Sequence, residues 1–295
     1  MDFKEKLKEY QILINNELEK YFLDDAPEKT LYESMRYSLL AGGKRLRPVL
    51  TLATYSIFKD DLSKCLTYAT AIEMIHNFSL IHDDLPGIDN DDFRHGKPTN
   101  HKQFNEATAI LAGDGLLNYA YLLLTEDLLA ETDDYMNYVK RVVFNELITA
   151  IQRMIIGEYV DTEFENKDIS SEMLEYIHTN KTGAFLRVAV RTGAILGMAS
   201  DEELERLTSY ADKIGLAFQI KDDILSEEGD EKVIGKPVGN DKEMGKATYV
   251  SKYGLDGAKE KLSETIDSAK KDIESFGEKS EFLIQIADYI GNRNK

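Results

Sequence analysis

The chain has 295 residues, with 36 lysines and arginines against 54 aspartates and glutamates, and a formal net charge of −18 at pH 7. A chain this acidic lacks the basic surface that general nucleic-acid binding or docking on anionic lipid requires. Its single cysteine, Cys65, excludes an internal disulfide and a cysteine-based zinc site, and its first residues do not have the layout of a signal peptide.

Apolar residues that recur every three or four positions predict helices along most of the chain. Before a polar loop at 89–105, the predicted helices are 2–21, 31–40, 46–57 and 62–82. After the loop they are 106–129, 133–163, 171–179, 181–198, 201–225, 249–252, 255–276 and 279–290. Gly113-Asp114-Gly115 is expected to interrupt the first of these. Because no strand pattern and no linker separates them, we predict an all-α bundle and a single domain over 1–295.

The longest apolar run, 107–124, contains Asp114 and is expected to be too short to span a membrane. The sequence therefore predicts a cytoplasmic protein without membrane insertion.

Five aspartates fall within ten residues, where a predicted helix runs into His82-Asp83-Asp84-Leu85-Pro86-Gly87 and on to Asp89. Carboxylates this close raise one another's pKa, and a divalent cation such as Mg²⁺ relieves their repulsion. A solvated acidic turn explains the same residues, so both interpretations stand at this point.

A second aspartate pair, Asp222-Asp223, also lies near the end of an apolar helix, with Gln219 on the same helix surface. Basic loops accompany the two pairs, at 42–48, 94–98, 181–183 and 235–237. Arginine binds a phosphate through two hydrogen bonds and lysine binds it as a point charge. Together these features indicate a phosphorylated substrate that binds through a metal ion.

Two residues of the helix before Asp83 are also of interest. His76 lies two helical turns before Asp83 on the same face, where it would meet a second phosphate or fill the core. Phe78 lies deeper in that helix and is expected to pack in the core.

Five segments of the chain, over about residues 30 to 260, resemble the trans-isoprenyl diphosphate synthases, and most closely the bacterial short-chain, farnesyl diphosphate synthase-like branch. They are Gly42-Gly43-Lys44-Arg45-Leu46-Arg47-Pro48, Leu80-Ile81-His82-Asp83-Asp84-Leu85-Pro86 with Asp89, Gly96-Lys97-Pro98-Thr99-Asn100-His101, Lys181-Thr182-Gly183-Ala184 and Phe218-Gln219-Ile220-Lys221-Asp222-Asp223.

The resemblance implies a helical fold around a deep central cavity, a homodimer, and head-to-tail condensation of isopentenyl diphosphate with an allylic diphosphate. By this resemblance, the residues that hold Mg²⁺ are Asp83, Asp84, Asp89, Asp222 and Asp223. Those that bind the allylic diphosphate are Arg94, Lys181 and Lys236, and those that bind isopentenyl diphosphate are Lys44, Arg47, His76 and His95. Lys181, Thr182 and Gln219 are the implied catalytic residues, and Thr182 and Gln219 would stabilise the allylic cation with oxygen dipoles.

The resemblance also bears on product length. In this family the residue five positions before the first aspartate closes the cavity in short-chain members, and here it is Phe78, followed by Ser79. An aromatic residue there favours farnesyl diphosphate, with geranyl and geranylgeranyl diphosphate as alternatives.

Three positions depart from the family pattern. Ser226 stands where a third acid is usual, followed by Glu227 and Glu228; His95 stands where a second arginine is usual; and Glu158 replaces a glutamine. These departures keep open a weak enzyme or a non-catalytic regulatory homologue of the same fold. A terpene cyclase or head-to-head coupling enzyme is a further alternative, against which the presence of Lys44, Arg47 and His76 counts. Because both aspartate pairs and the lysines are present, we prefer the elongating enzyme.

Overall fold

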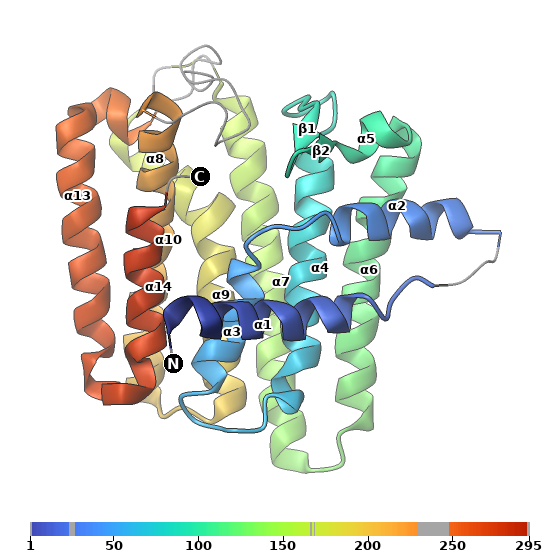
Figure 1. The fold of residues 1–295 in the computed structure, drawn as a ribbon, viewed down its shortest axis with the longest axis horizontal. Helices are drawn as coiled ribbons and strands as arrows, with labels where there is room; N and C mark the ends of the chain where they lie inside the picture. The colour runs from blue at the N-terminus through green and yellow to red at the C-terminus, as the bar shows by residue number, and fades with distance from the viewer. Residues whose placement is uncertain (1, 24–26, 166, 168, 229–247, 294–295) are drawn as a thin grey trace. The chain divides into compact units, whose positions relative to one another are not determined.

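The structure, a computed structural model, describes residues 2–23, 27–165, 167, 169–228 and 248–293. The chain divides into two compact units, one of Met1–Leu52 with Asp60–Arg141 and the other of Ala53–Lys59 with Val142–Lys295. Both are built from helices (Figure 1), which confirms the predicted all-α class. The single domain stays a prediction.

The first unit contains the helices that carry the first aspartate segment. They are α1 (Phe3–Leu18), α2 (Lys29–Leu39), most of α3 (Leu46–Tyr55), α4 (Ser63–Asp83), α5 (Asn100–Gln103), α6 (Glu106–Ala130) and the start of α7 (Asp134–Glu163).

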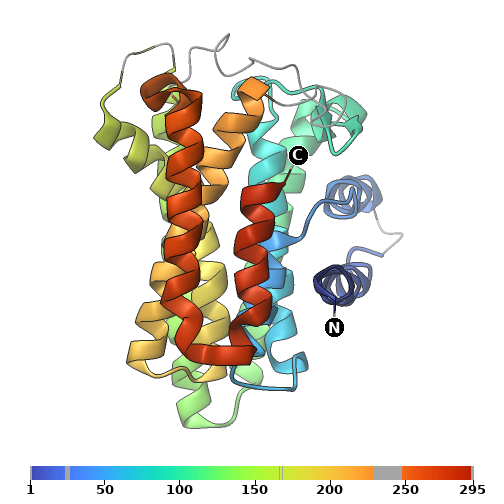
Figure 2. The same ribbon diagram turned by 60° about the vertical axis from the view of Figure 1, so that its left-hand side comes forward.

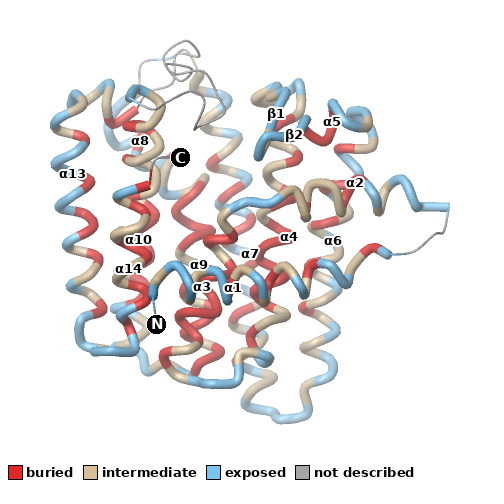
Figure 3. The backbone as a smooth tube through the Cα atoms, in the orientation of Figure 1, coloured by how far each residue is buried: buried red, intermediate tan, exposed pale blue. Residues whose placement is uncertain are grey.

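Helix α4 forms the core of this unit, and α6 lies alongside it (Figure 1). Twelve of its 21 residues are buried, on all its faces, as its dense run of apolar residues predicts (Figure 3). On α6, Ala109, Ala112, Leu116 and Ala120 are fully buried at helical spacing. The three alanines among them let the two helices approach closely, which fixes the direction in which α4 delivers its C-terminal aspartates.

The second unit carries the second aspartate pair. It contains the rest of α7, then α8 (Ser171–His178), the π-helical turn η1 (Thr179–Gly183), α9 (Ala184–Gly197), α10 (Asp201–Glu228), α13 (Tyr249–Ile273), the 3₁₀ segment η2 (Glu274–Ser280) and α14 (Glu281–Asn292). Helices α13 and α14 lie side by side and are joined through η2 (Figure 2). The phenolic hydroxyl of Tyr210, fully buried on α10, donates to the carbonyl of Leu283 on α14 at 2.7 Å and ties these two helices together.

The expected interruption of the long helix at Gly113-Asp114-Gly115 is wrong, because α6 runs unbroken from Glu106 to Ala130. Both glycines instead make room for side chains from other helices. A Cβ atom on Gly113 would lie 2.2 Å from the imidazole Nε2 of His82, and one on Gly115 would lie 3.1 Å from the end of Met35. Gly113 and Gly115 therefore allow close packing between helices and do not form a turn.

The polar stretch 89–105 is more ordered than the predicted loop. It contains a two-stranded antiparallel ribbon, β1 (Phe93–Arg94) with β2 (Lys97–Pro98), followed by the short helix α5. The turn of the ribbon needs left-handed backbone at His95 and Gly96, with φ of 52° and 75°. The ribbon fixes Arg94 in place beside the end of α4.

The expectation that no apolar run is long enough to cross a membrane also needs correction, because α6 has the necessary length and composition. The apolar run 107–124 is only part of this helix, which continues to Ala130. Its exposed apolar side chains are Ile110, Leu111, Leu122 and Leu129. The core helix of a soluble protein passes the same test, so this finding by itself is weak evidence for a membrane span.

Candidate active site

The first aspartate pair lies at the C-terminal end of α4, where Asp83 is the last helical residue and Asp84 is the cap. Acids at this end oppose the helix dipole, which favours cations there. The chain then turns back, and the amide of Asp89 donates to the carbonyl of Asp83 at 2.9 Å. The turn therefore brings Asp89, the third acid of the predicted motif, back to the C-terminal end of α4, which favours a cation.

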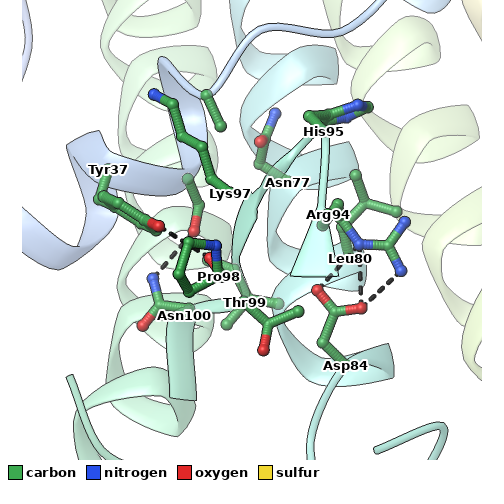
Figure 4. A pocket seen from close by; sticks show the side chains of 13 residues that line it. Tyr37, Asn77, Leu80, Asp84, Arg94, His95, Lys97, Pro98, Thr99 and Asn100 are labelled. Carbon is green, nitrogen blue, oxygen red and sulfur yellow. Dashed lines mark hydrogen bonds and ion pairs between the residues drawn. The ribbon is translucent and has the colours of Figure 1, made fainter. Parts of the chain in front are cut away.

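Arg94 from the ribbon holds the carboxylate of Asp84 through both oxygens (Figure 4). Its Nε lies 2.9 and 2.8 Å from the two oxygens, and its Nη2 donates to the first of them. The side chain of Asp84 is 3% exposed. Burial alone would lower the pKa of Arg94, but the hydrogen bonds and charge of Asp84 outweigh it and raise that pKa. The two residues thus form a two-pronged ion pair in which the raised pKa keeps the guanidinium charged.

The described part of the chain contains no ready-made cluster of three or more side chains that could hold a metal ion. Mg²⁺ commonly takes one or two carboxylates from the protein and its remaining ligands from water and substrate phosphates. The donors at the end of α4 are hard oxygens from partly exposed Asp83 and Asp89 and from Asp84, which Arg94 already holds. This donor chemistry fits an ion shared with a diphosphate better than an ion held by the protein alone.

A small pocket of about 20 Å³, room for roughly one water molecule, opens beside this ion pair (Figure 4). Its lining includes Asn77 and Asp84 from the end of α4, and Arg94, His95 and Lys97 from the ribbon. Two permanent cations therefore line a pocket at the end of α4. Lys97 was not among the predicted site residues, although its place in a basic loop was the available signal.

The three cations of the segment 42–48 have different surroundings. Arg45 is buried and donates to Glu73 and to the carbonyl of Leu39, both at 2.6 Å. It fixes the loop to the core of the unit and cannot reach a ligand. Lys44 and Arg47 remain partly exposed, as the predicted binding of a second diphosphate requires.

His76 lies beside Arg47, with 3.2 Å between its Nε2 and the Nη1 of Arg47. A guanidinium can only donate, so Nε2 accepts and the imidazole is neutral, with its proton on Nδ1. Burial, and then the charge of Arg47, lower the pKa of His76 well below its ordinary value. In the absence of an anion, His76 therefore orients Arg47 and adds no charge.

His95 joins the same basic cluster, since a Cβ atom on Gly43 would lie 3.3 Å from its Nε2. Burial lowers its pKa, and the charges of Arg94, Arg45 and Lys44 lower it further. His95 is thus neutral near pH 7, although three cations surround it. We call Lys44, Arg47, His76 and His95 the basic cluster; all four belong to the first unit, and their binding of isopentenyl diphosphate stays a prediction.

The predicted length-determining residues lie on α4. Phe78 is 7% exposed, and its ring meets that of His82 edge to face, with 5.0 Å between the centroids. Ser79 is half-buried, and its hydroxyl donates to the carbonyl of His76 at 3.0 Å. Phe78 is thus a core residue one and a half turns from Asp83, as the sequence indicated.

The second aspartate pair divides its two carboxylates between different partners. Asp223 is buried and accepts from the amide of Tyr249, at the start of α13, at 2.6 Å. Asp222 has a side chain that is 44% exposed and accepts from Arg293 at 2.6 Å. Arg293 was missed by sequence reasoning, because nothing in the sequence connects it to a residue 71 positions earlier.

Other predicted residues of this region have mixed outcomes. Gln219 is half-buried on α10, one helical turn before Asp223, and Ser226 is partly exposed. Glu228, one of the two glutamates that follow Ser226, pairs with Lys259 at 2.7 Å. Lys236 lies outside the described residues.

Lys181 lies in η1, between two acids of α7. Its Nζ is 2.8 Å from a carboxylate oxygen of Glu158 and 2.7 Å from one of Asp161. Burial opposes its charge, but the two carboxylates outweigh burial and raise its pKa. Asp161 was missed, although its spacing of three from Glu158 puts both on one helix face. One ammonium between two carboxylates leaves the group with one net negative charge.

Gly157 explains how α7 reaches this turn. A Cβ atom there would lie 2.2 Å from the backbone nitrogen of Lys181, so any side chain would push the two segments apart. π-helical turns are common at functional sites, and this one carries Lys181 with the buried Thr182 beside it. The unit thus brings together two of the three residues predicted to be catalytic.

Comparison with known proteins agrees with this arrangement. The polyprenyl synthetase family model matches residues 28–283. The chain is 43% identical over 290 residues to the farnesyl diphosphate synthase of Geobacillus stearothermophilus, covering 98% of this chain and 97% of that one. It is 45% identical over 285 residues to the farnesyl diphosphate synthase of Bacillus subtilis, covering 95% of each.

A solved structure, that of geranylgeranyl pyrophosphate synthetase from Pyrococcus horikoshii, matches with a TM-score of 0.88 at 30% identity, over 99% of this chain and 98% of that one. Family and fold were both predicted from the aspartate segments and basic loops, and both are confirmed. This chain belongs to the polyprenyl synthetase family.

Proposed function

We propose that this chain is a short-chain head-to-tail prenyltransferase that condenses isopentenyl diphosphate with an allylic diphosphate and releases farnesyl diphosphate. The observation that carries the proposal is the basic cluster beside the first aspartate segment. A terpene cyclase or a head-to-head enzyme has no use for a second, isopentenyl diphosphate-binding site. Membership of the family and likeness to two farnesyl diphosphate synthases support the same reaction.

In this proposal Asp83, Asp84 and Asp89 would hold Mg²⁺ for the allylic diphosphate, and Asp222 and Asp223 would also hold Mg²⁺. When bound, Mg²⁺ supplies the positive charge that lets the diphosphate leave. Arg94 and Lys181 are both fully charged, as their raised pKa values require, and both are held in place by carboxylates before substrate arrives. Cations that are already oriented need little reorganisation during the reaction.

The remaining steps need an apolar and dry surrounding. The leaving diphosphate departs with the electron pair of the carbon–oxygen bond, and the double bond of isopentenyl diphosphate attacks the allylic cation. The resulting cation then loses a proton to the departed diphosphate. Thr182, buried in η1, and Gln219 offer oxygen dipoles to the positive charge without reacting with it. Water must be excluded, because it would capture the cation.

One assay tests this reaction. Purified protein with Mg²⁺ and radiolabelled isopentenyl diphosphate is incubated with dimethylallyl or geranyl diphosphate, and the products are separated by chain length. We expect farnesyl diphosphate from both starters. No turnover, together with stable association with a homologous chain, would instead establish the regulatory alternative.

Product length is proposed to depend on Phe78. Replacing it by alanine removes the buried ring and opens space one and a half turns before Asp83, so the product should lengthen to geranylgeranyl diphosphate or beyond. Removing a buried phenylalanine costs about 3–5 kcal/mol of stability, so the assay is run below the lowered melting temperature. Phe282→Ala, which removes an equally buried ring from α14, is the matched control and should leave product length unchanged. Unchanged products from Phe78→Ala contradict this role.

We also propose that the enzyme is a cytoplasmic homodimer that does not insert into membranes. Three exposed leucines of α6 support an interface with a second copy, because Leu111, Leu122 and Leu129 are spaced by 11 and 7 residues and so lie on one face of the helix. Sedimentation equilibrium should give twice the chain mass of 33.5 kDa. Recovery of the chain in a carbonate-washed membrane fraction would contradict the proposal.

A further inference from the structure

Arg293, the residue that follows α14, has its side chain folded onto the last turns of α10. Its Nη2 donates to the carbonyl of Phe218 at 2.9 Å and to the carboxylate of Asp222 at 2.6 Å. Its guanidinium also lies 3.9 Å from the ring centroid of Phe218, a cation–π contact. These contacts bury the residue to 7% exposure.

The contacts differ in strength. The aromatic ring and the carbonyl of Phe218 hold the guanidinium beside Asp222, and a second cation on that carboxylate would repel it from both. The ion pair adds little to this, because the side chain of Asp222 is 44% exposed and water screens the attraction. The stability lost on breaking the pair is therefore small, and another cation can take its place on the carboxylate.

Arg293 also sets the charge at this end of α10. Its guanidinium carries a positive charge 2.6 Å from the carboxylate of Asp222. A charge this close disfavours a divalent cation on the same carboxylate.

We propose that Arg293 is the resident counter-ion of Asp222, which it occupies in the metal-free protein and releases when a divalent cation binds. Arg293 is a positioning residue in this scheme: it acts on the metal through Asp222 and does not touch reacting atoms. The inference rests on the proposed function, which assigns Asp222 to a metal. It adds that the carboxylate of Asp222 is neutralised until the metal arrives, and that Arg293 moves away when it does.

The first test measures metal binding without turnover. Mn²⁺ serves as the probe, and the electron paramagnetic resonance signal of the free aquo ion reports how much remains unbound, with inorganic diphosphate present throughout. We expect Arg293→Gln to bind Mn²⁺ at least about fivefold more tightly than the natural chain, since a competing charge-assisted hydrogen bond is gone. Arg293→Lys, which keeps the charge, should shift the affinity less.

Two controls separate this effect from a loosened helix. In the Asp222→Asn background, Arg293→Gln should change Mn²⁺ affinity by less than about twofold, because the carboxylate through which it acts is absent. Lys270→Gln removes the 3.0 Å ion pair that ties α14 to α13 through Asp288, away from Asp222, and should leave Mn²⁺ binding unchanged. Unchanged or weaker binding in Arg293→Gln overturns the proposal, as does the same gain in the Asp222→Asn background or in Lys270→Gln.

A second measurement needs no variant. Arg293 is the only arginine after Arg206, so free arginine released early by carboxypeptidases comes from it alone. Cleavage follows the population of the open form, so Mn²⁺ with diphosphate should speed arginine release at least about threefold. Release that is unchanged or slower overturns the proposal. Neither Mn²⁺ affinity nor arginine release depends on turnover. A chain that makes no prenyl diphosphate would therefore contradict the proposed function but not the role of Arg293.

Discussion

At the end of α4 the second acid of the pair, Asp84, is almost completely buried, and Arg94 donates three hydrogen bonds to it. On α10 the second acid, Asp223, is also buried, but it accepts from the backbone amide that begins α13. The first acid of each pair, Asp83 and Asp222, is partly exposed. Successive helical residues point about 100° apart, so one carboxylate turns inward and the other outward in both pairs.

The difference between the pairs is therefore in what neutralises the inward acid. A full charge from Arg94 does so in the first unit, whereas in the second unit an amide and the positive end of a helix do so. The first arrangement links the acid to a residue that also has a predicted role in binding substrate. The second links it to the position of α13. Substitutions at matched positions should consequently have unlike effects.

The largest effect is expected for Asp84→Asn. It leaves the guanidinium of Arg94 with only the more distant carboxylate of Asp91, at 3.7 Å, so we expect a loss of about 2–3 kcal/mol in the free energy of unfolding. It also removes an oxygen ligand for Mg²⁺ and frees Arg94, so turnover should fall by about 10²–10³. Urea unfolding followed by circular dichroism, and initial rates with geranyl and isopentenyl diphosphates, measure the two quantities.

The matched control is Asp92→Asn on the same loop. Asp92 pairs with Lys102 at 2.8 Å, but both side chains are well exposed and water screens the pair. Its loss should therefore leave the free energy of unfolding and turnover near those of the natural chain. If Asp84→Asn were as stable as this control, the ion pair with Arg94 would not hold the first segment together.

The second pair should give smaller and separable effects. Asp223→Ala removes the side-chain acceptor at the start of α13, a loss typically worth about 1–2 kcal/mol, and should speed hydrogen exchange at the amide of Tyr249. Asp222→Ala breaks a screened ion pair and should cost less than about 1 kcal/mol, with slow exchange kept at Tyr249. Both should lower turnover. Equal stability losses in the two variants would show that the carboxylates are not divided between a structural and an exposed position.

The sequence was enough to predict features that depend on neighbouring residues. Apolar spacing predicted the helices to within a few residues, and the acidic and basic segments predicted which ends of them would carry the site. It could not distinguish Arg45 from Lys44 and Arg47, because burial of Arg45 depends on Glu73 in another helix. Gly113 and Gly115 were misread for the same reason: their role depends on side chains that approach from α4 and α2.

The sequence also could not predict which basic residues pair with the aspartates of the two motifs. Asp84 with Arg94 bridges only ten positions, yet its two-pronged geometry needs the ribbon that the sequence presented as a loop. Asp222 with Arg293 joins residues that only the packing of α14 brings together. Composition indicates which charges are present, but the tertiary fold decides which of them remain available for a ligand.

The smallest expected effect belongs to His95, which lies among Arg94, Arg45 and Lys44 and is neutral near pH 7 because its pKa is lowered. His95→Arg places a permanent charge there. Without substrate it repels its neighbours, so the melting temperature should fall. With isopentenyl diphosphate bound, the new cation gains a charge-assisted hydrogen bond, so the KM for this substrate should fall about fivefold to tenfold at unchanged KM for the allylic diphosphate. His95→Gln, neutral like the histidine, should keep both KM values within about twofold. If the KM of His95→Arg for isopentenyl diphosphate also stays within twofold, the side chain at position 95 does not contact this substrate. His95 then serves only the turn between β1 and β2.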